Sequence, residues 1–149
     1  MESLSGKVFF ACVGIAAAVS LGTAEAGQNF RGPVAAIVLN IIDGDTFLAD
    51  AQVWPGQFVR VNVRIRGIDA PEMKSRCASE HDAALRARDA LAELIGDGAV
   101  SISNIGGAKY YGRVLADVET EQGVPVADEM LGRSLVRPYE GGRRAGWCG

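Results

Sequence analysis

The spacing of hydrophobic and polar positions changes several times along the chain. Residues 34–42 are rich in β-branched side chains and stop at an Asp-Gly-Asp sequence at 43–45, which is typical of a tight turn. A second apolar run follows at 46–49 and leads to a Trp-Pro-Gly loop at 54–56. Residues 58–66 then alternate with a period of two and place three arginines on one face. The pattern predicts a hairpin followed by a third, arginine-bearing strand.

The period lengthens in the next segment, where apolar residues of 78–95 fall on one helical stripe. Two further strands are predicted at 99–105 and 112–119, joined through the Gly-Gly pair that follows the first of them. A short helix at 126–133 and a short strand at 135–137 complete the pattern. This order predicts a mainly β (α+β) fold, a five-stranded and partly open barrel of the OB type with a helix between strands three and four.

The N-terminus has the composition of an export signal. An apolar run at 8–19 follows Lys7 and precedes Ala-Glu-Ala at 24–26, with small residues where a signal peptidase cleaves. The run is short for the roughly 20 residues that span a bilayer. We therefore expect residues 1–26 to be removed after Ala26 during export to the periplasm or the outside of the cell. An uncleaved membrane anchor is the alternative, and after cleavage no membrane association is expected.

The length of the chain leaves room for one domain after the expected signal, and the charge of that domain is close to neutral. After residues 1–26 we expect a polar lead-in at 27–33 and a single domain at 34–149, because 149 residues leave room for little more. The mature part would keep 14 basic and 16 acidic residues, a net charge of −2. This balance argues against sequence-independent coating of nucleic acid, although local basic clusters are present. A monomer is expected.

Two cysteines would survive cleavage of the signal. They are Cys77 and Cys148, since Cys12 lies in the removed segment. A metal site needs more soft ligands than two, and exported proteins carry disulfides. The sequence predicts a Cys77–Cys148 disulfide.

Three short segments carry residues that could do chemistry, and each lies at a strand end or turn: 43–46, 64–72 and 111–113. Two carboxylates, Asp45 and Asp69, together with a main-chain carbonyl and waters would suit calcium. Beside them, Glu72 could accept a proton from water. Arg64 and Arg113 could clamp a phosphodiester that gains charge in its transition state. Together these groups describe phosphodiester hydrolysis.

Each segment also has a purely structural interpretation. An Asp-Gly-Asp sequence is common in hairpin turns. Arg64 could be a solvated residue or pair with Glu72, and residues 69–72 could be an ordinary connection from strand to helix.

The combination of segments resembles a known family. Residues 42–46, 63–72 and 111–116 look like the three signature blocks of the staphylococcal nuclease (thermonuclease-like) family, and the likeness runs from about Val34 to the end of the chain. The resemblance implies an OB-fold, calcium-dependent nuclease that cleaves DNA and RNA and leaves 3′-phosphates.

The resemblance also implies the cation ligands. Asp45 and Asp69 would bind calcium through their carboxylates and Ala70 through its main-chain carbonyl, while Asp43 would lie just outside the ligands.

On the same pattern Glu72 would activate the attacking water. Arg64 and Arg113 would bind the phosphate and stabilise the transition state. Tyr111 corresponds to a tyrosine of the family's archetype, and Tyr139 either flanks the nucleotide pocket or packs in the core.

The chain departs from the archetype at several points. Ala70 stands in the place of a threonine, which leaves a carbonyl ligand intact, and Tyr110 stands in the place of a phosphate-binding lysine. The segment between Glu72 and the helix is shorter, and the long C-terminal helix is missing. The Cys77–Cys148 bridge would tie the tail to the start of the helix and replace the lost packing.

Two other functions compete with the nuclease. A non-catalytic OB-fold module could bind single-stranded nucleic acid or a protein, because this fold has many functions. The carboxylates could also form a purely structural calcium site.

Overall fold

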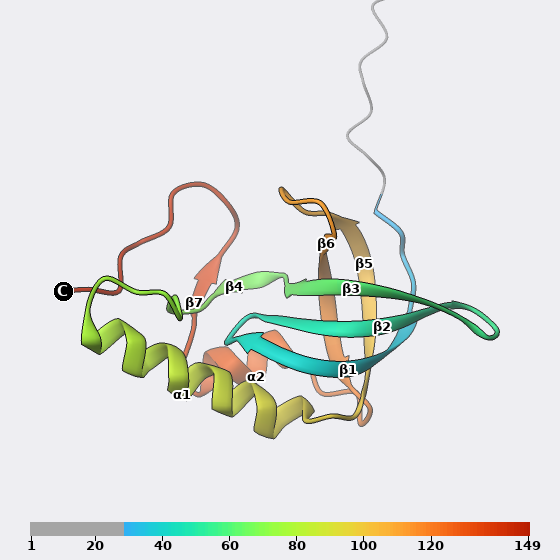
Figure 1. The fold of residues 1–149 in the computed structure, drawn as a ribbon, viewed down its shortest axis with the longest axis horizontal. Coiled ribbons are helices and arrows are strands. Elements are labelled where there is room, and N and C mark those ends of the chain that lie inside the picture. Colours follow the sequence, from blue (N-terminus) through green and yellow to red (C-terminus); the bar gives the residue numbers. More distant parts are fainter. Residues whose placement is uncertain (1–28) are drawn as a thin grey trace, which may run out of the picture.

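The structure of the protein, a computed structural model, describes residues 29–149. Five strands close into a barrel in the order β1-β2-β3-β6-β5, and a separate two-stranded sheet pairs β4 with β7 (Figure 1). The expected signal at 1–26 lies outside the described residues. Within 29–149, neither helix is long and apolar enough to cross a membrane. The elements are β1 (Val34–Asp43), β2 (Thr46–Trp54), β3 (Gln57–Ile65), β4 (Gly67–Asp69), α1 (Ala78–Ile95), β5 (Ala99–Gly107), β6 (Arg113–Thr120), α2 (Val126–Gly132) and β7 (Arg137–Tyr139).

The core of the barrel comes from the alternating positions of its strands. Phe47, Val63 and Ile102 point inward and are fully or almost fully buried. Leu91 and Ile95 of α1 complete this core, so the helix between the third and fourth barrel strands packs against the barrel. The mainly β fold with its helix at this position is confirmed, and the barrel is closed where a partly open one was expected.

Closure depends on one parallel pairing. β3 pairs with β6 in parallel, and Arg64 lies opposite Leu115. A parallel neighbour needs a long crossover connection, which α1 and β5 supply here. Hydrophobic periodicity does not reveal which strands pair, so this closure could not be read from the pattern.

The hairpin between β2 and β3 is longer than expected. β2 runs from Thr46 through Trp54, whereas the apolar run predicted only 46–49. In the extension, Asp50 lies opposite Arg60, and the Arg60 Nε lies 2.9 Å from the Asp50 Oδ1. This cross-strand ion pair supports the pairing of the two strands where apolar side chains no longer do. This ion pair is exposed and lowers the pKa of Asp50 through the hydrogen bond from Arg60.

Gly106 and Gly107 belong to the fourth barrel strand, whereas the sequence predicted them as the loop after it. β5 continues through Gly107 and has a register shift between Ser103 and Gly106, where Asn104 takes a left-handed conformation with φ of 48°. After this β-bulge, the two glycines pair with Leu115 and Val114 of β6. Phe30 of the lead-in pairs with Ile105 on the same strand.

The last strand lies two residues later than predicted. β7 spans Arg137–Tyr139 instead of 135–137, because the chain is still turning out of α2 at Ser134, whose φ is 57°. Val136 lies outside the strand, and its apolar side chain is buried in the core. β7 pairs with β4 and carries the chain back toward the start of α1, where Cys148 and Cys77 form the predicted disulfide.

Candidate functional site

The turn between β1 and β2 rests directly on helix α1. A Cβ atom at Gly44 would lie 2.6 Å from the Cβ of Ala87 and 2.9 Å from the Cβ of Ala70. No side chain fits in this space, so glycine is required between Asp43 and Asp45. The Asp-Gly-Asp sequence therefore does more than close a hairpin, because it places two carboxylates against the loop that leads into α1.

Asp45 is the most deeply buried acid of the site, with a relative exposure of 1%. Its Oδ1 accepts a hydrogen bond from the Thr46 hydroxyl at 2.8 Å and pairs with Arg64. Its Oδ2 accepts the main-chain N–H of Ala70 at 2.7 Å. A buried carboxylate is tolerated only when it is paired and hydrogen-bonded in this way. The three donors fix the direction in which its remaining lone pairs point.

Arg64 connects the hairpin to β4. It stands at the end of β3, opposite Thr46, and its guanidinium reaches Asp45 and, at 3.4 Å, Oδ1 of Asp69. It also donates to the main-chain carbonyl of Ile68 at 3.2 Å. Arg64 therefore holds two acids from separate segments, Asp45 from the β1–β2 turn and Asp69 from β4.

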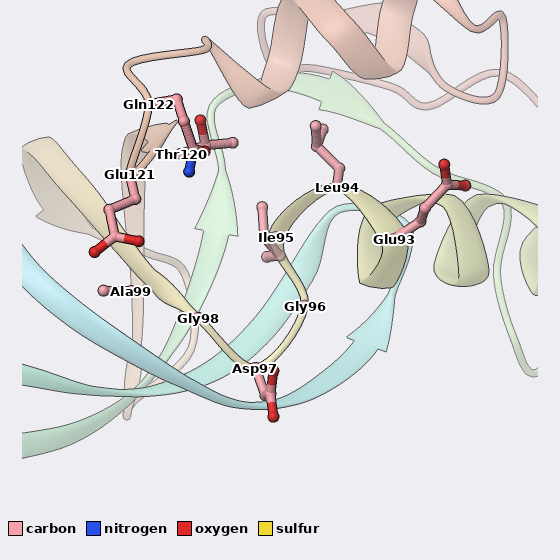
Figure 2. Close-up of a pocket in the computed structure, with 10 residues that line it drawn as sticks. All are labelled: Glu93, Leu94, Ile95, Gly96, Asp97, Gly98, Ala99, Thr120, Glu121 and Gln122. Carbon is pink, nitrogen blue, oxygen red and sulfur yellow. The ribbon is translucent and has the colours of Figure 1, made fainter.

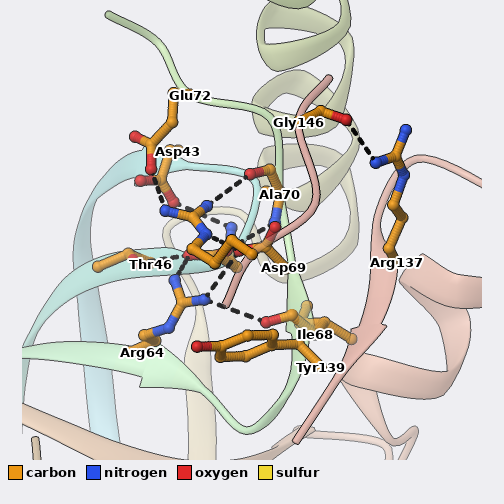
Figure 3. A network of polar contacts seen from close by, with 12 residues as sticks. Asp43, Thr46, Arg64, Ile68, Asp69, Ala70, Glu72, Arg137, Tyr139 and Gly146 are labelled. Atoms are coloured by element: carbon orange, nitrogen blue, oxygen red, sulfur yellow. Dashed lines mark hydrogen bonds and ion pairs between the residues drawn. The ribbon is translucent and has the colours of Figure 1, made fainter. Parts of the chain in front are cut away.

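Asp69 ends β4 and is buried. Ala70 and Glu72 follow in the loop before α1, and the main-chain N–H of Glu72 donates to Oε1 of Glu80 at 3.2 Å. Glu80 lies on the first turn of α1 and is itself buried, so the helix positions the backbone of Glu72. Figure 3 shows the carboxylates of Asp43, Asp69 and Glu72 facing one common space with the Ala70 carbonyl.

A second arginine, Arg144, reaches this space from the segment after β7. Its Nε pairs with Asp69, its Nη1 with Glu72, and its Nη2 donates to the carbonyl oxygen of Ala70 at 3.1 Å. Partial burial of Arg144 disfavours its charged form and by itself would lower its pKa. The hydrogen bonds to Glu72 and Asp69 outweigh burial and raise the pKa of Arg144 above its ordinary value.

Asp43 lies beside the cluster and accepts the main-chain N–H of Asp45 at 3.0 Å. Burial, together with the negative charge of Asp45, raises the pKa of Asp43 to about 7. Acidic groups that crowd one another in a partly buried place favour a positive charge nearby.

The cluster fits a hard divalent cation. Two carboxylates, Asp45 and Asp69, and the carbonyl of Ala70 offer only oxygen, the donor type that calcium takes with irregular geometry. The Arg144 guanidinium between Asp69 and Ala70 shows that these oxygens accept a positive charge. Within 29–149, the one group of three acid or thiol side chains whose ligand atoms all lie within 4.8 Å of one another is Cys77, Glu80 and Cys148, and its two sulfurs are already joined in the disulfide.

Two predicted residues lie apart from this network. Arg113 begins β6 opposite Asn62 and stacks on the ring of Tyr110 at 5.3 Å; within 29–149 it forms no ion pair. Tyr111 lies in the turn before β6 and is fully exposed. Both are available to a ligand that approaches across β3 and β6.

Tyr139 lies close to the network. It pairs with Gly67 in the small sheet and its hydroxyl donates to the carbonyl of Gly142 at 2.8 Å. The side chain is half-buried, and the strand that Tyr139 pairs with ends at Asp69. The structure therefore places Tyr139 at the wall of the cluster.

Two cavities of the described chain lie away from these residues. One of about 270 Å³ lies between the end of α1 and the β6–α2 loop (Figure 2). Its acids Glu93, Asp97 and Glu121 would repel a phosphate, and it includes no arginine. The other, of about 340 Å³, is lined by apolar side chains such as Phe30, Val59 and Ile105 and offers nothing to a cation.

Comparison with known proteins agrees with this arrangement. The family described as staphylococcal nuclease homologue matches residues 62–143, more than half of the chain. The chain belongs to this family, whose members are nuclease-like. The match includes Arg64, Asp69 and Glu72 and begins after the β1–β2 turn, so the structure alone adds Asp43 and Asp45 to the same cluster. No match to a curated protein was found.

Sequence reasoning did not find every residue of the cluster. The sequence patterns did not assign Arg144 or Glu80 to the site. The only available signal for Arg144 was its position four residues before Cys148, since the disulfide returns this segment to α1.

Proposed function

We propose that the protein is a calcium-dependent nuclease that hydrolyses the phosphodiester bonds of DNA and RNA and leaves 3′-phosphates. One observation carries the proposal: Asp69, Glu72 and the Ala70 carbonyl face one space, and Asp45 is held next to them by the Arg64 guanidinium that it shares with Asp69 and by the Ala70 N–H. Family membership supports nucleic acid as the substrate.

Asp45, Asp69 and Ala70 would hold the cation, which when bound would polarise phosphate oxygens and lower the pKa of water. Glu72 would accept the proton of the attacking water. Its side chain is half exposed, so water and substrate can reach it. The N–H···Glu80 hydrogen bond holds its backbone in place, and its carboxylate pairs with Arg144.

Arg64 and Arg113 would bind the phosphate. Arginine matches two phosphate oxygens at once and keeps its charge at any relevant pH. Arg64 lies on β3 beside the ligands, and Arg113 lies on the neighbouring strand β6, so the phosphate would bridge the two strands.

The proposal is tested by digestion of single-stranded DNA and RNA in calcium and in excess chelator. Cleavage in calcium is expected to fall to background in chelator, because the chelator removes the cation that would polarise the phosphate. Analysis of the product ends should show 3′-phosphates.

The same assay separates the competing functions. A folded protein that binds the strand and never cuts it would favour the non-catalytic OB-fold module. A calcium-dependent rise in melting temperature without cleavage would favour a structural calcium site.

We also propose that the domain acts as an exported monomer. A disulfide persists in oxidising compartments, which supports export. When the full chain is expressed in a bacterium, the exported form is expected to begin at Gly27, as N-terminal sequencing would show. A membrane-bound form that still begins at Met1 would instead favour the uncleaved anchor.

A further inference from the structure

The Arg144 guanidinium occupies oxygens of two of the three ligands that the proposed function assigns to the cation, and an oxygen of the proposed proton acceptor. All three of its nitrogens are used: one pairs with Asp69, one with Glu72, and one donates to the carbonyl of Ala70. A guanidinium cannot lose its proton in a protein. A bound Arg144 and a bound divalent cation therefore exclude each other at Asp69 and Ala70.

The segment around Arg144, residues 140–148, is fastened on both sides. Before Arg144, the Tyr139 hydroxyl donates to the carbonyl of Gly142. After it, Arg137 donates to the carbonyl of Gly146 at 2.9 Å (Figure 3). The Arg137 guanidinium also stacks on Trp147, with its Cζ 3.7 Å from the centre of the ring. The disulfide from Cys148 to Cys77 closes the segment onto the start of α1.

Such a tether gives Arg144 a high effective concentration at the site, because its return needs no diffusion. The side chain is nevertheless 37% exposed, so solvent and ions reach it. A competitor that is held close but not enclosed can be displaced by a ligand of higher charge.

We propose that residues 140–148 form a strap that keeps Arg144 in the cation site, so that calcium binds only by displacing it. This inference rests on the proposed cation site. Without calcium, the strap also pairs Glu72 and keeps the proton acceptor occupied. Breaking the disulfide weakens the competition because it frees the end of the strap.

The test measures calcium binding by isothermal titration calorimetry on the purified protein, which requires no cleavage. Arg144→Gln removes the competing charge and is expected to tighten calcium binding roughly 5- to 150-fold, the usual range of coupling between two ligands. The matched control is Arg143→Gln, since Arg143 forms no ion pair within 29–149. Its affinity for calcium should stay near that of the wild type.

A further variant separates occupation of the site from simple repulsion. Arg144→Lys keeps the charge but loses the fork that spans three oxygens. The strap predicts tighter calcium binding than in the wild type, whereas repulsion alone predicts wild-type affinity.

Replacing both cysteines, Cys77→Ser with Cys148→Ser, is expected to move the calcium affinity toward that of Arg144→Gln. Adding Arg144→Gln to this pair should then have a smaller effect than in the wild type, since the two changes act on one competitor. Circular dichroism confirms folding of the cysteine variant, and the Arg144 variants, which keep the disulfide, test the competition independently of it.

The outcomes separate this inference from the proposed function. Equal calcium affinity in the wild type and in Arg144→Gln overturns the strap and leaves the nuclease standing. An absence of calcium binding in every folded variant overturns both. Tighter binding in Arg144→Gln with an unchanged cysteine variant overturns the role of the disulfide.

Discussion

Replacing Glu72 with glutamine is expected to lower the turnover of nucleic acid by roughly two to four orders of magnitude, the contribution of a positioned general base. The amide keeps the size of the side chain but cannot accept the proton of the attacking water. The fold should be unaffected because Glu72 is half exposed and its backbone N–H, which the change retains, bonds Glu80. Single-turnover cleavage in saturating calcium measures the effect.

The substitution also breaks the ion pair between Glu72 and Arg144. The same change in an Arg144→Gln background separates the two effects, since the loss of activity should persist there. The matched control is Glu121→Gln in the acidic cavity at the far end of α1, which should cleave at the wild-type rate. Near-normal cleavage by Glu72→Gln in both backgrounds would remove Glu72 from the mechanism.

Replacing Arg113 with alanine is expected to lower the turnover by roughly two to three orders of magnitude, the usual cost of losing one donor to a charged transition state. Arg113 stacks on Tyr110 and forms no ion pair within the described chain, so its removal leaves no buried charge behind. The melting temperature should therefore stay near that of the wild type while cleavage falls.

Arg60→Ala supplies the control for this prediction. Arg60 is a largely exposed β3 arginine that pairs with Asp50 on the neighbouring strand. Cleavage should be unchanged in this variant. Arg113→Lys should recover only part of the activity, because an ammonium group cannot meet two phosphate oxygens in one plane. Wild-type cleavage by Arg113→Ala would show that the phosphate does not reach β6.

Local patterns along the sequence predict the elements that depend on local spacing. The helix at 78–95 agrees with α1 at both ends, because its apolar stripe and the glycines after it are properties of neighbouring residues. The Asp-Gly-Asp turn and the arginine-bearing strand are also where they were expected. The disulfide followed from the number of cysteines and the expected export.

The remaining features depend on contacts between distant segments. The pairing of β4 with β7 joins two strands of three residues each, too short for an alternation to be visible. The same pairing and the disulfide bring Arg144 back to Asp69, and apart from the distance to Cys148 no pattern within residues 140–149 indicates that contact. The sequence therefore predicted Asp45, Asp69 and Glu72 as one group but not the arginine that joins two of them.

The missing side chain at Gly44 has a mechanical consequence. Because only backbone and methyl groups separate the β1–β2 turn from α1 and Ala70, the distance between Asp45 and the loop that bears Ala70 is set by direct contact. Flexible side chains could absorb a small shift of the helix, but none lies between these surfaces. A displacement of α1 would therefore also move the β1–β2 turn, and the distance between Asp45 and the other proposed cation ligands would depend on how closely the helix packs on the barrel.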